Sequence, residues 1–334
     1  MSDPGAASLA AWHDVPAGHK QVLRCPVTTR PDGSQVTLPA VVLRGATAGP
    51  TLLVSAGVHG DEFEGMVALQ TLTAQLDPAQ LRGTLVAVPV VNMRAYEAGL
   101  RVNPEDRQDL ARVFPGDRHG TVTQQIAHVF TEQFIRHADF YCDLHSAGQY
   151  YAIEPWVGYQ LKPELLPRQR EAAALFGLST VWGTSYLPGR TLSAAAQYNV
   201  PSLYVEVTGE GRCRDDDVAA LIHGVQQLLA WLGITTGPPR PHQPLRVVED
   251  DRPDAGYLQG QLQATCDGLF RPAVTLGQQV TQGGVFGRIV SPTGETLATA
   301  AAPASGRVVF LRTFPRVVAG DPLGTVMEIP QGNS

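Results

Sequence analysis

The sequence predicts an α/β fold, in which a mainly parallel sheet is covered by helices on both faces, followed by a smaller all-β unit. Apolar runs of strand length alternate with segments of helical spacing through the first two thirds of the chain, a pattern typical of sheets buried on both faces. A proline-rich stretch at 235–244 then has the composition of a linker. Beyond it, short β-type runs separated by glycines show no helical pattern.

The individual elements can be placed from spacing and turn residues. A hairpin is expected at about 20–44, because two β-type runs flank the turn 31–34 (Pro-Asp-Gly-Ser). Hydrophobic periodicity predicts buried strands at 51–58, 83–92, 138–148 and 202–207, and helices at about 64–76, 122–137, 164–177 and 215–232. We therefore expect two domains, an α/β domain over 1–238 and a β-rich domain over 245–334.

Composition and charge narrow the classes of function. The chain has 334 residues, of which 43% are hydrophobic and 17% charged, a balance typical of globular proteins. A net charge of −6 without any basic run argues against nucleic acid as a partner. No apolar stretch is long enough to cross a membrane, and no secretory signal pattern is evident. We therefore expect a cytoplasmic protein without a membrane partner, whose four dispersed cysteines form no zinc-binding pair.

Polar residues follow two of the predicted strands directly. His59 and Glu62 come after the run 51–58, and Asp143 and His145 end the run 138–148. In an open α/β sheet the ligand crevice lies at the carboxyl ends of the strands, so these side chains are expected to meet. Two histidines and one carboxylate with an open fourth position are typical of a catalytic zinc site. In such a site Asp143 is a candidate for orienting an imidazole.

Four motifs in order resemble the succinylglutamate desuccinylase/aspartoacylase family, whose members are relatives of the zinc carboxypeptidases. They are GVHGDEFEG, VNMRAYEAGLRVNPEDRQDLARVFPGD, CDLHSAG and YVEVTGEG, and the resemblance covers about residues 50–235. The phrase NPEDRQDLARVFPGD is most similar to the branch of N-acyl amino acid and N-acetyl-diaminobutyrate deacetylases. The resemblance implies a zinc-carboxypeptidase-like mixed sheet with helices on both faces, plus a small barrel-sandwich-like β domain at the C-terminus.

The resemblance also implies residue roles. It places one Zn²⁺ per chain on His59, Glu62 and His145, and a general base on Glu206. It gives Arg101 the role of stabilising the oxyanion, and Arg112, together with Arg101, that of binding the substrate. The implied activity is zinc-dependent hydrolysis of the amide bond of a small N-acylated amino acid or amine, which is not a peptide bond.

Two departures from the family pattern put the substrate in doubt. The usual Asp-Leu-Asn-Arg reads Asp-Leu-Ala-Arg here, so that Ala111 replaces an amide that helps to hold a substrate carboxylate. Glu210 stands in the usually glycine-rich stretch after the base, which favours a substrate with a cationic end.

Other interpretations remain open at this stage. Glu64 is an alternative ligand to Glu62, and each arginine is also explained by a salt bridge with Asp106 or Asp109. The competing functions are a zinc carboxypeptidase acting on peptide C-termini and a non-catalytic metal or small-molecule binding protein on the same scaffold. The sequence does not identify the acyl and amine groups of the substrate or the metal that is bound in the cell. It also leaves open the role of the β domain and the oligomeric state, for which a homo-oligomer is one alternative.

Overall fold

The computed structural model describes residues 12–30, 32–253 and 255–328 of the chain. The expectation that the chain starts without a signal sequence concerns residues that lie mostly outside this range. None of the helices in the described part has the length and apolar composition that a membrane crossing requires.

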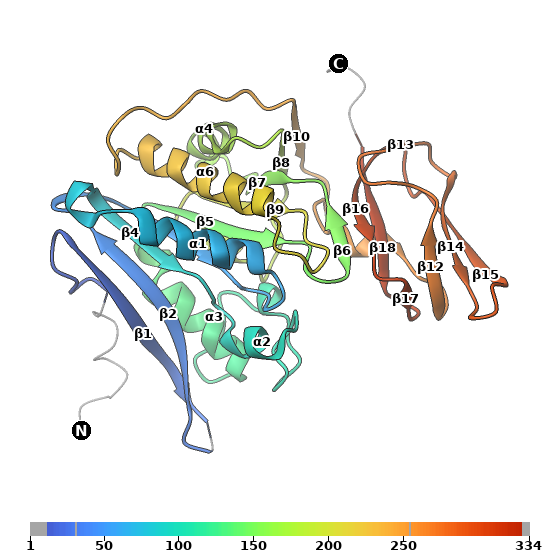
Figure 1. The fold of residues 1–334 in the computed structure, drawn as a ribbon, viewed down its shortest axis with the longest axis horizontal. Helices are drawn as coiled ribbons and strands as arrows, with labels where there is room; N and C mark the ends of the chain where they lie inside the picture. Colours follow the sequence, from blue (N-terminus) through green and yellow to red (C-terminus); the bar gives the residue numbers. More distant parts are fainter. Residues whose placement is uncertain (1–11, 31, 254, 329–334) are drawn as a thin grey trace.

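A mixed sheet of nine strands organises the larger unit of the described chain (Figure 1). Its central strands run parallel, while antiparallel pairs extend it on both sides. In sheet order the strands are β1 (His19–Thr29), β2 (Gln35–Arg44), β4 (Arg82–Val88), β3 (Thr47–Ala56), β5 (Phe140–Ser146), β9 (Ser202–Val207), β7 (Trp156–Gln160), β8 (Thr180–Thr184) and β10 (Arg246–Asp250). The hairpin expected at about 20–44 is formed by β1 and β2.

Helices cover both faces of this sheet. Successive strand residues point to opposite sides, so each central strand contributes side chains to a core on either face. Leu52 and Val54 of β3 face one hydrophobic core, whereas Leu53 faces the other. The first core packs against α1 (Phe63–Gln75), α4 (Leu166–Phe176) and α6 (Asp215–Trp231), and the second against α3 (Val122–Gln133) and α5 (Thr191–Gln197). A short helix, α2 (Met93–Ala98), follows β4. The predicted α/β class is therefore confirmed.

Local sequence explains where two of the longer helices begin. Thr121 and Gln124 form a reciprocal capping box at the start of α3, which satisfies backbone donors that a helix start leaves unpaired. Helix α6 begins with three aspartates at 215–217, whose charges suit the positive end of the helix dipole.

Two small sheets form the C-terminal unit and enclose a separate core that includes Phe270, Phe286 and Val326. One contains β11 (Leu262–Gln263), β18 (Pro322–Met327), β16 (Gly306–Arg312) and β13 (Gln279–Val280), and the other β15 (Thr296–Ala301), β14 (Val285–Val290), β12 (Gly268–Pro272) and β17 (Arg316–Val317). No α-helix occurs within the described part of this unit, as the sequence predicts.

The two units exchange strands, which differs from the simple division expected at 238–245. Strand β10 follows the proline-rich stretch but pairs in parallel with β8 and so completes the edge of the large sheet. Conversely, β6 (Tyr151–Ile153) leaves the large unit and pairs with β16. A linker composition marks where the chain is irregular, and it does not show which sheet the next strand joins. Residues 246–250 therefore belong to the large sheet and not to the β-rich domain that was expected over 245–334. The rest of the division into two domains remains a prediction.

Phe310 provides a test of the contact between the two units. It is 4% exposed, and its ring stacks on Tyr151 with centroids 4.7 Å apart. We expect Phe310→Ala to lower the free energy of unfolding by about 3–5 kcal/mol, because it leaves a cavity at this contact. Phe314→Ala is the matched control, since Phe314 is 44% exposed, and it should cost less than about 1 kcal/mol. Denaturant unfolding measures both, and equal losses would contradict this account.

Candidate active site

The carboxyl ends of three neighbouring parallel strands deliver most of the site. Strands β3, β5 and β9 are adjacent in the sheet, and residues 57–62 turn from the end of β3 into α1. His145 lies near the end of β5, and Glu206 is its register partner on β9. The expectation that polar residues after these strands meet in one crevice therefore holds in the structure.

His59, Glu62 and His145 form a buried group that can hold a metal ion. One ligand atom from each lies within 4.8 Å of the others, and no other such group of three occurs among the described residues. The Glu62 carboxylate lies between the two rings, with Oε1 2.7 Å from His59 Nδ1 and Oε2 2.8 Å from His145 Nδ1. Two imidazole nitrogens and a carboxylate oxygen are a donor set that suits Zn²⁺. The geometry brings Glu62, and not Glu64, into this group.

A carboxylate orients each imidazole from its other nitrogen. Asp109 Oδ1 lies 3.1 Å from His59 Nε2, and Asp143 Oδ2 lies 3.0 Å from His145 Nε2. Asp143 is itself fixed, because the hydroxyls of Ser55 and Thr191 both donate to it at 2.6 Å. Such outer partners set the tautomer and the angle of metal-binding histidines. The sequence predicted this role for Asp143 but considered Asp109 only as a salt-bridge partner of arginine.

Close packing determines the path of the turn that carries His59 and Glu62. A Cβ atom at Gly60 would lie 2.0 Å from the carbonyl carbon of Ala95 in α2, a distance that no side chain permits. Gly60 therefore allows the turn to lie directly on α2. This contact positions His59 and Glu62, on either side of Gly60, toward β5.

Glu206 is a candidate proton acceptor. Burial raises the pKa of its carboxyl to about 7, which places its proton exchange near neutral pH. Its Oε2 atom is buried and has no hydrogen-bond partner within the described part of the chain, while the residue as a whole is half-buried. A buried carboxylate oxygen without a partner is costly, and such groups are common at functional sites. By contrast, the two imidazoles beside Glu62 hold the pKa of that carboxyl below its ordinary value, although burial alone would raise it.

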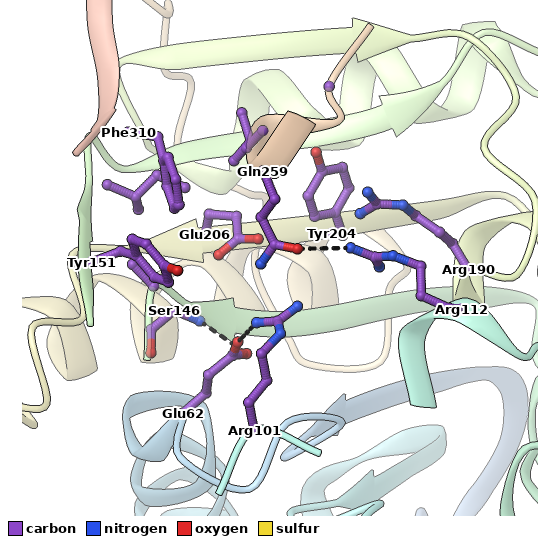
Figure 2. A pocket seen from close by; sticks show the side chains of 14 residues that line it. Glu62, Arg101, Arg112, Ser146, Tyr151, Arg190, Tyr204, Glu206, Gln259 and Phe310 are labelled. Atoms are coloured by element: carbon purple, nitrogen blue, oxygen red, sulfur yellow. Dashed lines mark hydrogen bonds and ion pairs between the residues drawn. The ribbon is translucent and has the colours of Figure 1, made fainter. Parts of the chain in front are cut away.

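Two adjoining cavities of about 40 and 60 Å³ surround these groups and share Arg101, Arg190, Tyr204 and Glu206. Figure 2 shows the first of them, where the three arginine side chains and Glu206 converge. Its other lining residues come from both units of the protein and include Glu62, Arg112, Tyr151, Gln259 and Phe310. The second is lined by His59, His145, Ala111, Leu187 and Leu192 among others. Glu210 is not among the residues that line either cavity; it pairs with Arg214.

The two predicted arginines are in different electrostatic environments. Arg101 donates to Glu62 Oε1 at 3.2 Å and to Asp109 Oδ2 at 3.4 Å, so it is paired with two carboxylates while still lining the cavity. Arg112 donates to the carbonyl of Ala111 at 2.9 Å and to Gln259 Oε1 at 3.3 Å. The salt-bridge alternative with Asp109 therefore applies to Arg101, and no ion pair of Arg112 is found in the residues described.

Sequence reasoning missed Arg190 and Gln259. Arg190 is brought beside Arg112 because Gly189, with a φ of +79°, lies against the Arg112 backbone, where a Cβ atom would be 2.2 Å from the carbonyl oxygen. The only local signal was a Pro-Gly pair before Arg190, which is typical of any turn. Gln259 comes from beyond the proline-rich stretch, and nothing in its neighbourhood marks it.

The fold and the buried group define a class of protein, an α/β protein with a candidate His₂Glu metal site at the strand ends and small adjoining cavities. A family model for the succinylglutamate desuccinylase/aspartoacylase catalytic domain matches residues 48–232. The chain belongs to this family. The resemblance that the sequence motifs suggested is therefore confirmed.

Relatives cover most of the chain. An N-alpha-acetyl-L-2,4-diaminobutyric acid deacetylase of Halomonas elongata is 32% identical over 302 residues, which are 88% of this chain and 86% of the relative. Among solved structures, a succinylglutamate desuccinylase/aspartoacylase from Rhodobacter sphaeroides matches with a TM-score of 0.82 and 29% identity, over 94% of this chain and 97% of that one. The ectoine utilization protein EutE (DoeB) from Ruegeria pomeroyi, in a product-bound structure, matches with a TM-score of 0.82 and 27% identity over the same shares. These matches extend through the C-terminal β unit and confirm the predicted carboxypeptidase-like fold with its added β domain.

The metal group predicts a specific result for two variants. We expect about one Zn²⁺ per chain in the wild-type protein, and its loss in His59→Ala and in His145→Ala, because either change leaves only two ligands. Metal content measured by mass spectrometry checks this. His119→Ala is the matched control, since His119 is exposed and lies outside the group, and it should keep the metal. A wild-type protein that stays metal-free after incubation with zinc would contradict the assignment.

Proposed function

We propose that the protein is a zinc-dependent deacylase that hydrolyses the amide bond of a small N-acylated amino acid. The observation that carries this proposal is Glu206, a half-buried residue whose Oε2 atom is buried and unpartnered beside a His₂Glu group. Membership in the family and the name of the Halomonas elongata relative support the same reaction class.

His59, Glu62 and His145 would hold one Zn²⁺, and their donor atoms fit that ion. When bound, Zn²⁺ supplies a water of lowered pKa and polarises the scissile carbonyl. The Oε2 atom of Glu206 would accept a proton from the water that attacks the carbonyl carbon. Glu206 then donates the proton to the amide nitrogen, so that the C–N bond breaks and a carboxylate and a free amine leave.

Arg101 would stabilise the oxyanion that forms on the carbonyl oxygen. Its guanidinium is fixed by Glu62 and Asp109 and still borders the cavity that contains Glu206. A donor that is already oriented stabilises developing charge without reorganisation during the reaction.

Arg112 and Arg190 would bind a carboxylate of the substrate. Both line the cavity, and no carboxylate pairs with either of them in the described chain. Burial and, next in size, the nearby Arg190 guanidinium lower the pKa of Arg112, and the Asp109 carboxylate offsets this only in part. Arginine forks match a carboxylate in two-point geometry. Two such groups provide an anion site even though Ala111 replaces the family's asparagine.

The substrate to test first is N-alpha-acetyl-L-2,4-diaminobutyric acid, which the name of the Halomonas elongata relative contains. It carries a carboxylate for the arginines and a short acyl group that suits a small cleft. A peptide carboxypeptidase would instead prefer dipeptides, and a binding protein would retain zinc while hydrolysing neither. Initial rates on both substrate classes therefore separate the three functions.

Glu206→Gln tests the general base. The amide keeps the size of the carboxylate but cannot accept the proton, so we expect kcat to fall by about 10²–10⁴-fold while the metal is retained. Glu171→Gln, at an exposed position on α4, is the matched control and should leave kcat unchanged. A Glu206→Gln protein with wild-type kcat would remove Glu206 from the mechanism.

Arg190→Ala tests the anion site. We expect KM for the N-acetyl amino acid to rise by about ten- to hundred-fold, because a charge-assisted hydrogen bond is lost. The matching N-acetyl amino acid carboxamide should show little change, because it offers no carboxylate. Arg24→Ala, at an exposed position on β1, is the control. Equal changes in KM for acid and carboxamide would show that Arg190 does not recognise charge.

A further inference from the structure

A short turn of the C-terminal region reaches into the catalytic cleft. It contains the 3-10 helix Leu258–Gly260, which lies between β10 and the first strand of the C-terminal unit. Gln259 Oε1 accepts a hydrogen bond from Arg112 Nη2 at 3.3 Å, as Figure 2 shows. The centroid of the Tyr257 ring lies 5.5 Å from Arg112 Cζ, within the range of a cation–π contact. Two residues of this turn therefore hold the arginine assigned to the substrate carboxylate.

Strand β18 holds this turn from behind. Thr325 Oγ1 donates to the carbonyl of Leu258. The side chain of Gln261 pairs with Val326 at both ends, accepting from its N–H at 2.6 Å and donating to its carbonyl at 3.1 Å. These anchors flank Gln259 on both sides. Contacts with the C-terminal sheet on both sides of Gln259 thus fix the position of the Gln259 side-chain amide.

None of the groups in direct contact with Arg112 carries a charge, although the Asp109 carboxylate acts on Arg112 from a greater distance. The groups in contact are the carbonyl of Ala111, the amide of Gln259 and the ring of Tyr257. Arg101, by contrast, is paired with two carboxylates. A neutral acceptor fixes the direction of a guanidinium and leaves its charge available to a ligand, whereas a carboxylate in the same place would compete with that ligand.

We propose that Gln259, supported by Tyr257, is a positioning residue that orients Arg112 toward the substrate carboxylate without placing a carboxylate against its guanidinium. The C-terminal β unit then contributes to the substrate site. It affects the affinity for the acid and does not take part in the chemical step. This inference rests on the proposed function, because it takes the bound ligand to be an N-acyl amino acid.

Two substitutions of nearly equal size separate orientation from simple support. Gln259→Met keeps the length but removes the acceptor, and it should raise KM by about three- to tenfold, the range of one hydrogen bond. Gln259→Glu keeps the acceptor but adds a charge, and it should raise KM by more than about tenfold, because the new carboxylate pairs with Arg112 and repels the substrate. In both variants kcat should stay within about twofold, the signature of a group that acts on binding.

The same substitutions at Gln279 are the matched controls, since Gln279 is exposed on β13 and does not line the cavity. Gln279→Met and Gln279→Glu should match the wild-type KM. A purely structural role for Gln259 predicts the opposite ranking, in which the more conservative Gln259→Glu is the milder change.

Coupling to Arg112 identifies the route of the effect. In an Arg112→Ala background, Gln259→Glu should raise KM by a smaller factor than in the wild-type background, because the group that it neutralises is absent and only repulsion of the substrate remains. The carboxamide of the substrate should be insensitive to Gln259→Glu in the wild-type background. Additive effects of the two substitutions would overturn the inference.

Equilibrium binding makes failure of this inference distinguishable from failure of the proposed function. Calorimetry with N-alpha-acetyl-L-2,4-diaminobutyric acid, in a Glu206→Gln background that prevents turnover, should show at least tenfold weaker binding for the added Gln259→Glu. If the wild-type protein binds the acid but hydrolyses none of the panel, and Gln259→Glu weakens binding, the deacylase proposal fails and this inference stands. If hydrolysis occurs and Gln259→Glu binds as tightly as its parent, only this inference is overturned. No binding of any panel member would overturn both.

Discussion

The carboxylate of Glu62 is the group around which the site is built. It is 2% exposed, and it is contacted by the rings of His59 and His145, by the guanidinium of Arg101 and, at 3.3 Å, by the backbone N–H of Ser146. A buried carboxylate is costly unless such partners are present. They come from the turn after β3, from β5 and from the loop after α2, so the fold must bring three separate segments together to satisfy one side chain. The same arrangement leaves two imidazole nitrogens and a carboxylate oxygen facing each other, which is what a metal ion needs.

Charge is distributed unequally around the cleft, and this inequality carries the proposed specificity. On the side of the metal group, carboxylates and cations compensate one another, as Arg101 does with Glu62 and Asp109. Arg112 and Arg190 share the lining of the cavity with three other charged residues, Glu62, Arg101 and Glu206, and neither arginine forms an ion pair among the described residues. A small molecule with an anionic end and a neutral amide would match this pattern, because the cationic side binds its carboxylate and the balanced side receives the bond to be cleaved.

Periodicity and motif order predicted the fold class and the metal group, because both depend on local patterns: apolar strands and the polar residues that follow them. The i, i+3 spacing of His59 and Glu62 was enough to favour Glu62 over Glu64. The sequence did not indicate Arg190 or Gln259, because each reaches the cleft through contacts made far along the chain. Gly189 lies on the backbone of Arg112, and the turn at 257–261 is anchored on β18. The path of β10 was missed for the same reason, since strand pairing across a linker leaves no local trace.

The dependence of the turn at 257–261 on β18 means that the cleft is completed from a distant part of the chain. The metal group draws on residues that precede position 150, and Glu206 follows on β9. The turn that contacts Arg112 is anchored on residues 322–327, which pair with β16. A chain truncated before residue 322 would therefore keep the residues of the metal group and lose the anchors of this turn.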